Sequence, residues 1–342
     1  MKIKEIINYL ENLAPKEYSL DWDNCGIQVG SLEKEIKNIS IALTPTIEII
    51  EKAIENKSDF LITHHPMIFK SLKSINTDSP IGKMIELSLK NNLTVYTMHT
   101  NFDSVETGLN YEIAKDLNLN NIELLSISGQ YNYYKIVIFV LSENTNKIID
   151  IVSKTNQNFY NSKKENILVF NYSDKDRIEI TSTKKEYKHI IKNLKENIDN
   201  DFLYDVYKIE DKEYKYGIGT IGVLSKPKKL EEIIKEIKLN LNLKNLTYVG
   251  EPSKNIERIA ICTGSGSSFI NLAKQKGADL YITGDIKYHT AIDANEINLA
   301  MIDAGHYGTE IICVKFISNY IKKEYNNIDV FDIIENDPFF YA

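Results

Sequence analysis

The sequence has neither a long apolar run nor an excess of positive charge. No window approaches the roughly 18 consecutive apolar residues of a membrane-spanning helix, and residues 1–5 lack the apolar stretch of a signal peptide. Lys and Arg total 41 against 48 Asp and Glu, which gives a net charge of −7. Sequence-independent binding of nucleic acid depends on basic blocks, and none is present. We therefore expect no membrane partner and no nucleic-acid partner.

Cysteine is equally scarce. The chain contains three cysteines, Cys25, Cys262 and Cys313, and no Cys-x-x-Cys pair. An odd number without such pairs argues against a disulfide framework and against a thiolate zinc site. We therefore expect a protein of the reducing cytoplasm.

The chain does contain enough apolar residues to form sizeable cores. Of its 342 residues, 43% are hydrophobic and 26% are charged, a balance typical of globular proteins with more than one domain. In both outer parts of the chain, short apolar runs typical of buried strands alternate with helical patterns. This order favours an α/β fold with largely parallel strands.

The two outer parts also resemble each other. Residues 38–65 align without a gap on residues 258–285, and both segments predict a strand, a helix and a second strand with the pattern Asp-x-x-Ile-Thr. In each part, a later strand ends before a histidine that is followed four residues on by a carboxylate. The repeat predicts two related three-layer α/β halves that form one core.

The middle of the chain has a different composition. Residues 127–216 are rich in Tyr, Lys and Asn and poor in Gly and His. Their pattern predicts the order β-α-β-β-α-β of a ferredoxin-like α+β domain. We therefore expect a first α/β half over residues 1–127, an inserted domain over 128–216, and a second half over 217–342 that completes the core.

Polar residues that can bind a metal follow several predicted strands. They are His64, His65, the pair His99 and Asp103, and the pair His306 and Glu310. Ligands bind at the carboxyl ends of strands in α/β sheets, and a His and an acid four residues apart share one side of a helical turn. Structural histidines or acids at a helix start would explain each motif singly. Together, the three clusters predict a metal site.

The ligand types narrow the choice of metal. Imidazole and carboxylate without thiolate suit Zn²⁺, Mn²⁺, Fe or Ni²⁺ better than Ca²⁺ or Mg²⁺. Five or more ligands exceed the needs of one tetrahedral zinc ion, so we expect two divalent ions per chain, bridged by a carboxylate and a water. A bridging hydroxide would be a nucleophile near neutral pH.

Three further segments leave alternatives open. Asp285 and His289 are predicted as orienting residues or a proton shuttle, with ordinary loop residues as the alternative. The turn 263–268 could hold a phosphate or carboxylate on its amides, but a tight turn with a serine cap is favoured, since the P-loop lysine is missing. The segment around Trp22, the only tryptophan, forms either a rim of the site or a turn with a buried indole.

Five motifs together resemble one family, known as GTP cyclohydrolase I type 2 and also as the Ngg-interacting-factor-three-like family. The motifs are Trp-Asp-Asn-x-Gly-x-Gln-Val-Gly at 22–30, Thr-His-His-Pro at 63–66, His-Thr-Asn-x-Asp at 99–103, Thr-Gly-Asp-x-Lys-Tyr-His at 283–289 and Gly-His-Tyr-x-Thr-Glu at 305–310. They occur in the family's order and cover both outer parts. Phe102 departs from the aliphatic residue usual there, which is a change in packing. The middle part resembles the PII/CutA-like insert of longer bacterial members.

The resemblance implies a dinuclear metal site and a homohexameric ring whose sites face an internal cavity. Its ligands would be His64, His65, Asp103, His306 and Glu310. His99, Asp285 and His289 are then the expected catalytic residues beside these ligands.

Two classes of function follow. The first is a metal-dependent hydrolase, in which the bridging hydroxide attacks a small polar or nucleotide-like substrate; no residue here points to the cyclohydrolase reaction itself. The alternative is a non-catalytic metal-binding or regulatory protein with the PII-like insert as its sensor. Turnover that disappears when one ligand is replaced would distinguish the two.

Overall fold

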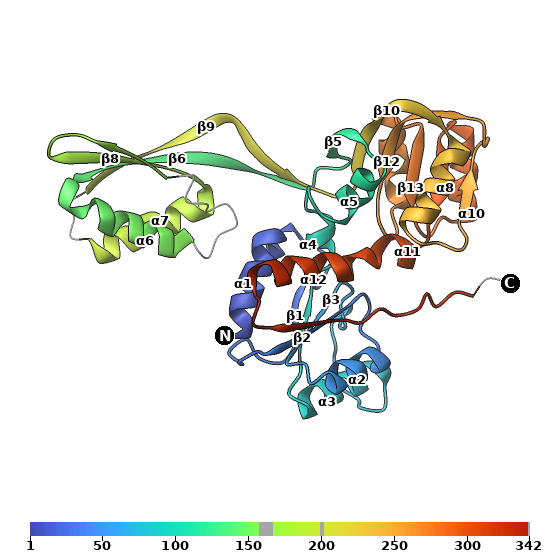
Figure 1. Ribbon diagram of the computed structural model, residues 1–342, viewed down its shortest axis with the longest axis horizontal. Helices are drawn as coiled ribbons and strands as arrows, with labels where there is room; N and C mark the ends of the chain where they lie inside the picture. The colour runs from blue at the N-terminus through green and yellow to red at the C-terminus, as the bar shows by residue number, and fades with distance from the viewer. Residues whose placement is uncertain (157–166, 199–201, 341–342) are drawn as a thin grey trace. The chain divides into compact units, whose positions relative to one another are not determined.

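The computed structural model describes residues 1–156, 167–198 and 202–340, which form three sheets in a mixed α/β fold. The chain divides into two compact units, whose segments are coloured by residue number in Figure 1. The core unit comprises residues 1–10, 14–128 and 216–342, and the insert unit comprises residues 11–13 and 129–215.

The first sheet of the core unit has five strands in the order β1-β4-β3-β2-β15. The last four run parallel, and β1 pairs antiparallel with β4. The strands are β1 (Gly26–Val29), β2 (Asn38–Ala42), β3 (Phe60–Thr63), β4 (Thr94–Thr97) and β15 (Asp329–Asp332). The helices of this part are α1 (Ile3–Leu13), α2 (Ile47–Glu55) and α3 (Pro80–Lys90).

The second sheet of the core unit has six strands in the order β11-β14-β13-β12-β10-β5. Its centre, β12 to β14, is parallel, and the outer strands pair antiparallel. The strands are β5 (Asn120–Leu124), β10 (Thr220–Lys229), β11 (Thr247–Val249), β12 (Asn255–Ile261), β13 (Leu280–Thr283) and β14 (Ala300–Asp303). The helices are α8 (Leu230–Asn240), α9 (Ile270–Gln275) and α10 (Tyr288–Glu296), and short 3-10 turns are η1 (Lys16–Tyr18) and η4 (Ser267–Phe269).

The central strands of the two sheets pair in equivalent registers. The matching pairs are Ile41 with Ile62 and Ile261 with Ile282. In each sheet, one carboxylate also accepts hydrogen bonds from two backbone amides at the neighbouring strand: Asp59 in the first sheet and Asp279 in the second. The aligned segments of the sequence therefore have the same local structure.

The chain crosses between the sheets twice. After β4, helices α4 (Thr100–Asp103) and α5 (Leu109–Asp116) lead to β5 in the second sheet. After β14, helices α11 (His306–Glu310) and α12 (Ile312–Glu324) lead to β15 in the first sheet. Helix α5 contacts β10 and β12, whereas α12 contacts β2 and β15. The two crossing segments carry both acids of the expected ligand set, Asp103 and Glu310.

The middle strands β3 and β13 are buried along their whole length. Ile282 packs with Ile233 and Ile237 of α8, whereas the preceding residue, Tyr281, packs in a separate cluster with Ala273 of α9. Successive side chains thus enter helix layers on opposite faces of the sheet. This explains why both strands are continuous apolar runs, as parallel strands covered on both faces require.

The insert unit contains one antiparallel sheet with the order β7-β8-β6-β9. Its elements along the chain are β6 (Gly129–Leu141), η2 (Ser142–Asn144), α6 (Thr145–Asn156), β7 (Ile167–Asn171), β8 (Lys175–Thr183), α7 (Lys184–Asn197) and β9 (Phe202–Tyr216). Ile136, Ile138 and Val140 of β6 pack with Ile148 and Val152 of α6, which gives the unit a core of its own.

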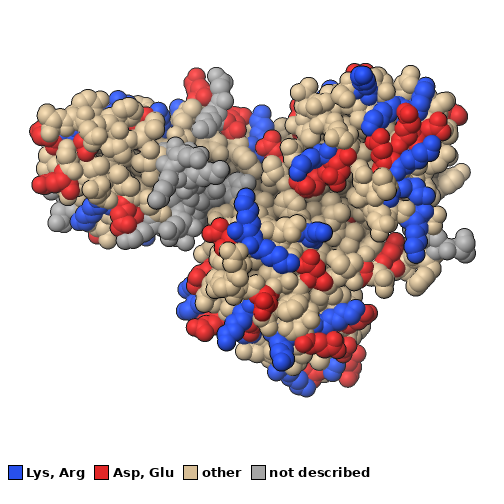
Figure 2. Space-filling view, viewed as in Figure 1, with Lys and Arg blue, Asp and Glu red and all other residues tan. Residues whose placement is uncertain are grey.

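The surface agrees with the mixed charge of the sequence. Lys and Arg side chains are interspersed with Asp and Glu over the face drawn in Figure 2. None of the helices in the described part of the chain combines the length and apolar character that crossing a bilayer needs.

The core of the first sheet can be tested at Ile62, which has no exposed surface. We expect Ile62→Ala to lower the free energy of unfolding by about 2–5 kcal/mol, because it leaves a cavity between covered faces. Urea unfolding followed by Trp22 fluorescence reports on the core unit, since Trp22 is the only tryptophan. Ile75→Ala, at a side chain that is 61% exposed, is the matched control and should change little. Equal effects of the two substitutions would contradict this packing.

Candidate metal centre

Side chains from both crossing segments meet at the carboxyl end of β3. His64 and His65 follow β3 directly, and His99 lies between β4 and α4. Asp103 ends α4, whereas α11 begins at His306 and ends at Glu310. The cluster that forms consists of His64, His65, His99, Asp103, His306 and Glu310.

Glu310 lies at the middle of this cluster. Its Oε2 is 2.9 Å from Nε2 of His65 and 3.0 Å from Nε2 of His306. Its Oε1 is 3.8 Å from Nε2 of His64, and Oδ1 of Asp103 is 3.6 Å from the same nitrogen. Since the glutamate side chain is only 4% exposed, one buried carboxylate joins groups from the first and the second sheet.

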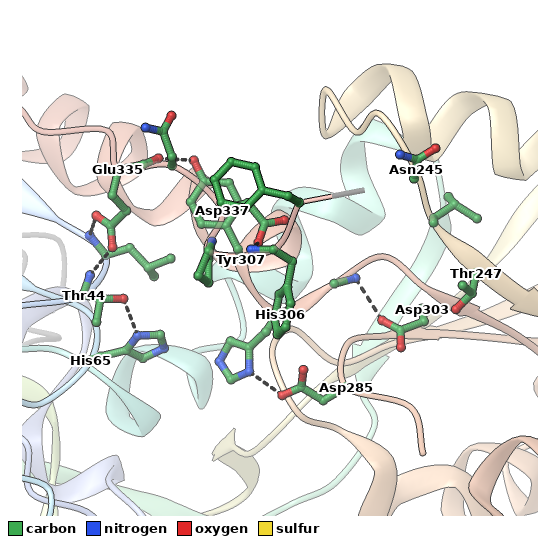
Figure 3. A pocket seen from close by; sticks show the side chains of 17 residues that line it. Thr44, His65, Asn245, Thr247, Asp285, Asp303, His306, Tyr307, Glu335 and Asp337 are labelled. Atoms are coloured by element: carbon green, nitrogen blue, oxygen red, sulfur yellow. Dashed lines mark hydrogen bonds and ion pairs between the residues drawn. The ribbon is translucent and has the colours of Figure 1, made fainter. Parts of the chain in front are cut away.

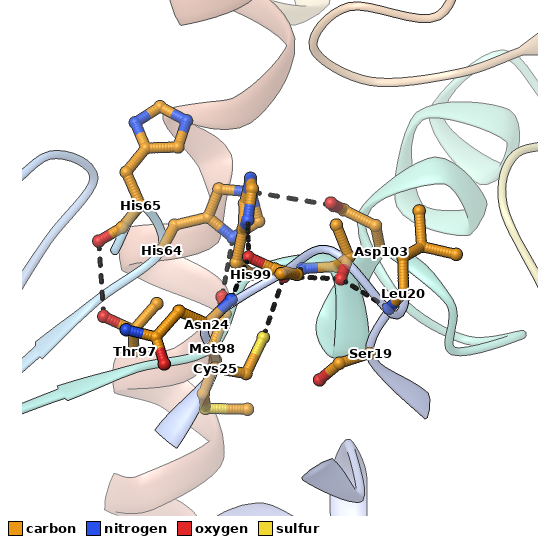
Figure 4. Close-up of polar contacts among 12 residues, drawn as sticks. Ser19, Leu20, Asn24, Cys25, His64, His65, Thr97, Met98, His99 and Asp103 are labelled. Carbon is orange, nitrogen blue, oxygen red and sulfur yellow. Dashed lines mark hydrogen bonds and ion pairs between the residues drawn. The ribbon is translucent and has the colours of Figure 1, made fainter. Parts of the chain in front are cut away.

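Each of the four imidazoles is held at Nδ1 by another group (Figures 3 and 4). The partners are the Met98 carbonyl oxygen for His64 (2.8 Å), Thr44 Oγ1 for His65 (2.9 Å), Asp23 Oδ1 for His99 (2.9 Å) and Asp285 Oδ2 for His306 (2.7 Å). Partners of this kind orient an imidazole and leave Nε2 for a metal ion. Because a carbonyl oxygen only accepts, Nδ1 of His64 carries a hydrogen, and its Nε2 has a free lone pair when the ring is neutral.

Two buried polar atoms have no hydrogen-bond partner. Among the described residues, Nε2 of His64 and Oδ1 of Asp103 are buried without a hydrogen-bond partner. Buried polar atoms are rarely left in this state, and a cation between the two would satisfy both. Ligand atoms within 4.8 Å of one another are offered by His64, His65 and His99, and by His65, His306 and Glu310. The donor set therefore fits a divalent cation.

The charges of the cluster depend on one another. Burial opposes the charged form of His64, but Asp103 and Glu310 together outweigh it and raise the pKa of this imidazole to about 9. The hydrogen bond to Glu310 likewise raises the pKa of His306 to about 9. Burial raises the pKa of Asp103 to about 6, whereas Glu310, although buried, has a pKa well below its usual range because three imidazoles contact it. Positive charge on the imidazoles is what balances the buried acids.

Gly264 lies so close to the carboxylate of Glu310 that there is no room for a side chain at position 264. Its φ is +62°, and a Cβ at this position would lie 2.0 Å from Oε1 of the glutamate. Three amides of the turn 263–268 already have protein acceptors: Thr263 with Asn110 Oδ1, Gly264 with Thr309 Oγ1 and Gly266 with Thr283 Oγ1. These bonds agree with the tight turn that the sequence favoured over an anion site.

The structure brings Asp285 to the cluster but not His289. Asp285 holds Nδ1 of His306, and it adopts a left-handed backbone with φ 56°. His289 lies on α10 with an exposed side chain, and its described ring contact is with Tyr288. A catalytic role for His289 stays a prediction.

One cavity of about 510 Å³ reaches the cluster from the side of the acids. Asp103, Glu310 and His99 line it together with Trp22 and Phe69. Residues Trp22 and Phe69 are 58% and 51% exposed, and their ring centroids are 5.8 Å apart. The indole therefore belongs to a cavity rim, and the alternative of a buried indole is wrong.

A second cavity, of about 670 Å³, borders the cluster at His65 and His306 (Figure 3). Its wall includes Thr44, whose backbone amide donates to the carboxylate of Glu335 at 2.7 Å. The hydroxyl of Tyr307 donates to the backbone carbonyl of the same glutamate. The C-terminal segment thus fixes two residues that adjoin the imidazoles.

Sequence reasoning missed Thr44, Gly264 and Asp23 as parts of the site. The internal repeat carried a signal for two of them, since Thr44 and Gly264 occupy matching places after β2 and β12 when the aligned segments are superposed. Asp23 lies in the segment around Trp22, for which the sequence left open a rim of the site or a turn with a buried indole.

The sequence matches a known family and several named proteins over most of its length. The model of the Duf34/NIF3 (NGG1p interacting factor 3) family matches residues 1–338. A Bacillus subtilis protein named GTP cyclohydrolase 1 type 2 homolog is 31% identical over 332 residues, with 90% of this chain and 89% of that protein covered. A Halalkalibacterium halodurans protein of the same name is 30% identical, with 98% and 97% covered.

Solved structures resemble the chain over its whole length. A Bacillus cereus protein related to NIF3 superposes with a TM-score of 0.83 at 28% identity, covering 100% of this chain and 99% of that one. A Staphylococcus aureus protein gives a TM-score of 0.75 at 28% identity with the same coverage.

The raised pKa of His64 predicts how the stability of the metal-free protein depends on pH. The folded pKa of about 9 exceeds the ordinary value of 6.5, so the protonated ring stabilises the fold at low pH, and this contribution is lost as pH rises through about 9. Between pH 6 and pH 10, we expect this contribution to the free energy of unfolding to fall by on the order of 3 kcal/mol. Urea unfolding of wild type and of His64→Gln at both pH values measures it, because the variant lacks the contribution. If wild type and His64→Gln show the same pH dependence of stability, that dependence does not come from His64.

Proposed function

Because the chain belongs to the Duf34/NIF3 family, we propose that its buried cluster binds two divalent cations and that the protein is a metal-dependent hydrolase of a small polar or nucleotide-like substrate. The observation that carries this proposal is the pair of orphaned acceptors, Nε2 of His64 and Oδ1 of Asp103. Two buried acceptors that face each other at 3.6 Å need either a proton or a cation between them.

The cation ligands in this proposal come from the end of β3 and from both crossing segments. They are His64, His65, Asp103, His306 and Glu310. Glu310 is the bridging candidate, since its two oxygens face different imidazoles. Carboxylate bridges of this kind are usual in two-metal sites.

The residues around the ligands would do the remaining work. When bound, the cations supply Lewis acidity and an activated water. Asp285 keeps His306 oriented, and Thr44 does the same for His65. The cavity of about 510 Å³ is the candidate substrate site, because it contacts Asp103 and Glu310 and has the exposed ring of Trp22 at its rim.

Replacing the bridging candidate tests both metal binding and catalysis. We expect Glu310→Ala to lower the metal content from about two ions per chain to one or none, and to abolish hydrolysis of any substrate found in a panel of nucleotides and phosphoesters. Elemental analysis of purified protein measures the first effect, and Tyr307→Phe, on the same helix α11, is the matched control with unchanged metal.

The outcomes separate the two classes of function. Equal metal content in Glu310→Ala and wild type means that this ligand is wrongly assigned. Metal binding without turnover on any compound favours the alternative, a non-catalytic metal-binding or regulatory protein with a PII-like sensor.

We also propose that residues 128–216 are an inserted ferredoxin-like domain between two related α/β halves, and that the chain assembles into a homohexameric ring. The element order of the insert unit and the equivalent registers of the two sheets support the first part. The ring rests on the resemblance to the family alone.

Removal of the insert tests its independence. The amide of Ser128 donates to the carbonyl of Tyr216 at 2.9 Å, so the ends left by deleting residues 129–215 adjoin and need only a short Gly/Ser bridge. We expect the shortened protein to fold and to retain the metal content of the full chain, because every proposed ligand lies in the core unit. A shortened protein that is soluble but metal-free would contradict the independence of the insert.

The ring is tested separately by light scattering of the full chain, where a monomer would contradict it.

A further inference from the structure

Asp23 is a buried carboxylate that the proposed ligand set does not use. Its side chain has no exposed surface. Oδ1 accepts from the amide of Asn24 at 2.8 Å, and Oδ2 accepts from the amide of Thr100 at 3.0 Å, from the hydroxyl of Thr100 at 2.5 Å and from the thiol of Cys25 at 3.0 Å. The remaining partner of Oδ1 is Nδ1 of His99, at 2.9 Å.

This arrangement determines where His99 carries its hydrogen. All five contacts come from groups that can donate, and the hydrogen bonds from His99, Cys25 and Thr100 together lower the pKa of Asp23 although burial opposes this. An ionised carboxylate only accepts, so Nδ1 of His99 must be the protonated nitrogen. Nε2 is then the free nitrogen of the neutral ring.

The ring of His99 lies beside the proposed ligands. Its ring centroid is 5.2 Å from that of His64 and 5.6 Å from that of His65, and His99 lines the cavity of about 510 Å³. Nε2 of His306 and of His65 each contact Glu310 at hydrogen-bond distance. Among the described residues, no carboxylate is recorded at Nε2 of His99, which leaves this nitrogen available to a substrate or a water.

We propose that Asp23 is a positioning residue, which keeps the proton of His99 on Nδ1 and presents Nε2 to the cavity as the proton acceptor of the hydrolytic step. The second half of this proposal rests on the proposed function. In the step, the oxygen of water bonds to the electrophilic atom of the substrate while Nε2 takes one of its protons. The leaving group then receives that proton from Nε2 as its bond breaks, and His99 returns to its starting form.

A buried carboxylate behind an imidazole is a recurrent way to fix its tautomer and orientation. Asp285 and His306 form a similar pair, but there the carboxylate is 48% exposed and the imidazole contacts Glu310. The two pairs therefore differ in what the far nitrogen can do.

The tautomer itself can be measured, with or without metal. The chain has six histidines, so selective ¹⁵N-histidine labelling gives few signals, and His99→Gln identifies the pair that belongs to His99. We expect wild type, both metal-free and loaded with Zn²⁺, to show His99 protonated at Nδ1. Wild type protonated at Nε2 instead would overturn the proposal, whatever any variant does.

Substitution of Asp23 tests positioning. In Asp23→Asn and Asp23→Ala, we expect the Nε2–H form of His99 to appear while the Zn²⁺ content stays equal to that of wild type. If a hydrolysed substrate is known, kcat should fall about 100-fold or more while KM changes by less than about threefold, as for loss of general base catalysis. Cys25→Ala removes a hydrogen bond to the other oxygen of the same carboxylate and is the matched control with an unchanged tautomer.

The outcomes separate this inference from the proposed function. An unchanged tautomer in both Asp23 variants, or an equal change in Cys25→Ala, overturns the positioning role. Absence of turnover on every compound overturns the proposed hydrolase, whereas the tautomer still decides whether Asp23 positions His99.

Discussion

The candidate metal centre depends on one buried acid, Glu310, whose carboxylate faces three imidazoles. Such a carboxylate is costly to bury unless positive charge meets it at close range. Here that charge is delivered by His64 and His65 from the end of β3 and by His306 from the same helical turn. The two sheets are therefore joined by an electrostatic contact, whose acids Asp103 and Glu310 lie on the crossing helices α4 and α11.

Much of this centre was predictable from the sequence because it obeys local rules. His64 and His65 follow an apolar run, and the carboxyl ends of parallel strands meet at one edge of a sheet. The spacing of four residues between His306 and Glu310 places both on one side of a helical turn. In the middle segment, β7 and β8 likewise follow each other where the expected order β-α-β-β-α-β has two consecutive strands.

Other features depend on contacts between distant segments and were not predictable. The group that holds His64 is the backbone carbonyl of Met98, and a backbone group cannot be recognised from the type of residue that carries it. Asp23 meets His99 across a long stretch of chain, and only the fold shows that its carboxylate is buried. The strands β5 and β15 each join the sheet of the opposite half. No local pattern indicates this, because the sequence of a strand does not determine which strand it pairs with.

In the proposed metal-loaded protein, a cation replaces the proton between His64 and the acids. Anomalous X-ray diffraction from crystals of the Zn²⁺-loaded protein, recorded on both sides of the zinc absorption edge, tests it most directly. We expect two anomalous peaks within the cluster, one beside Nε2 of His64 and Oδ1 of Asp103 and one beside Nε2 of His65 and His306. A cluster without anomalous density, in crystals that hold zinc elsewhere on the protein, would contradict it.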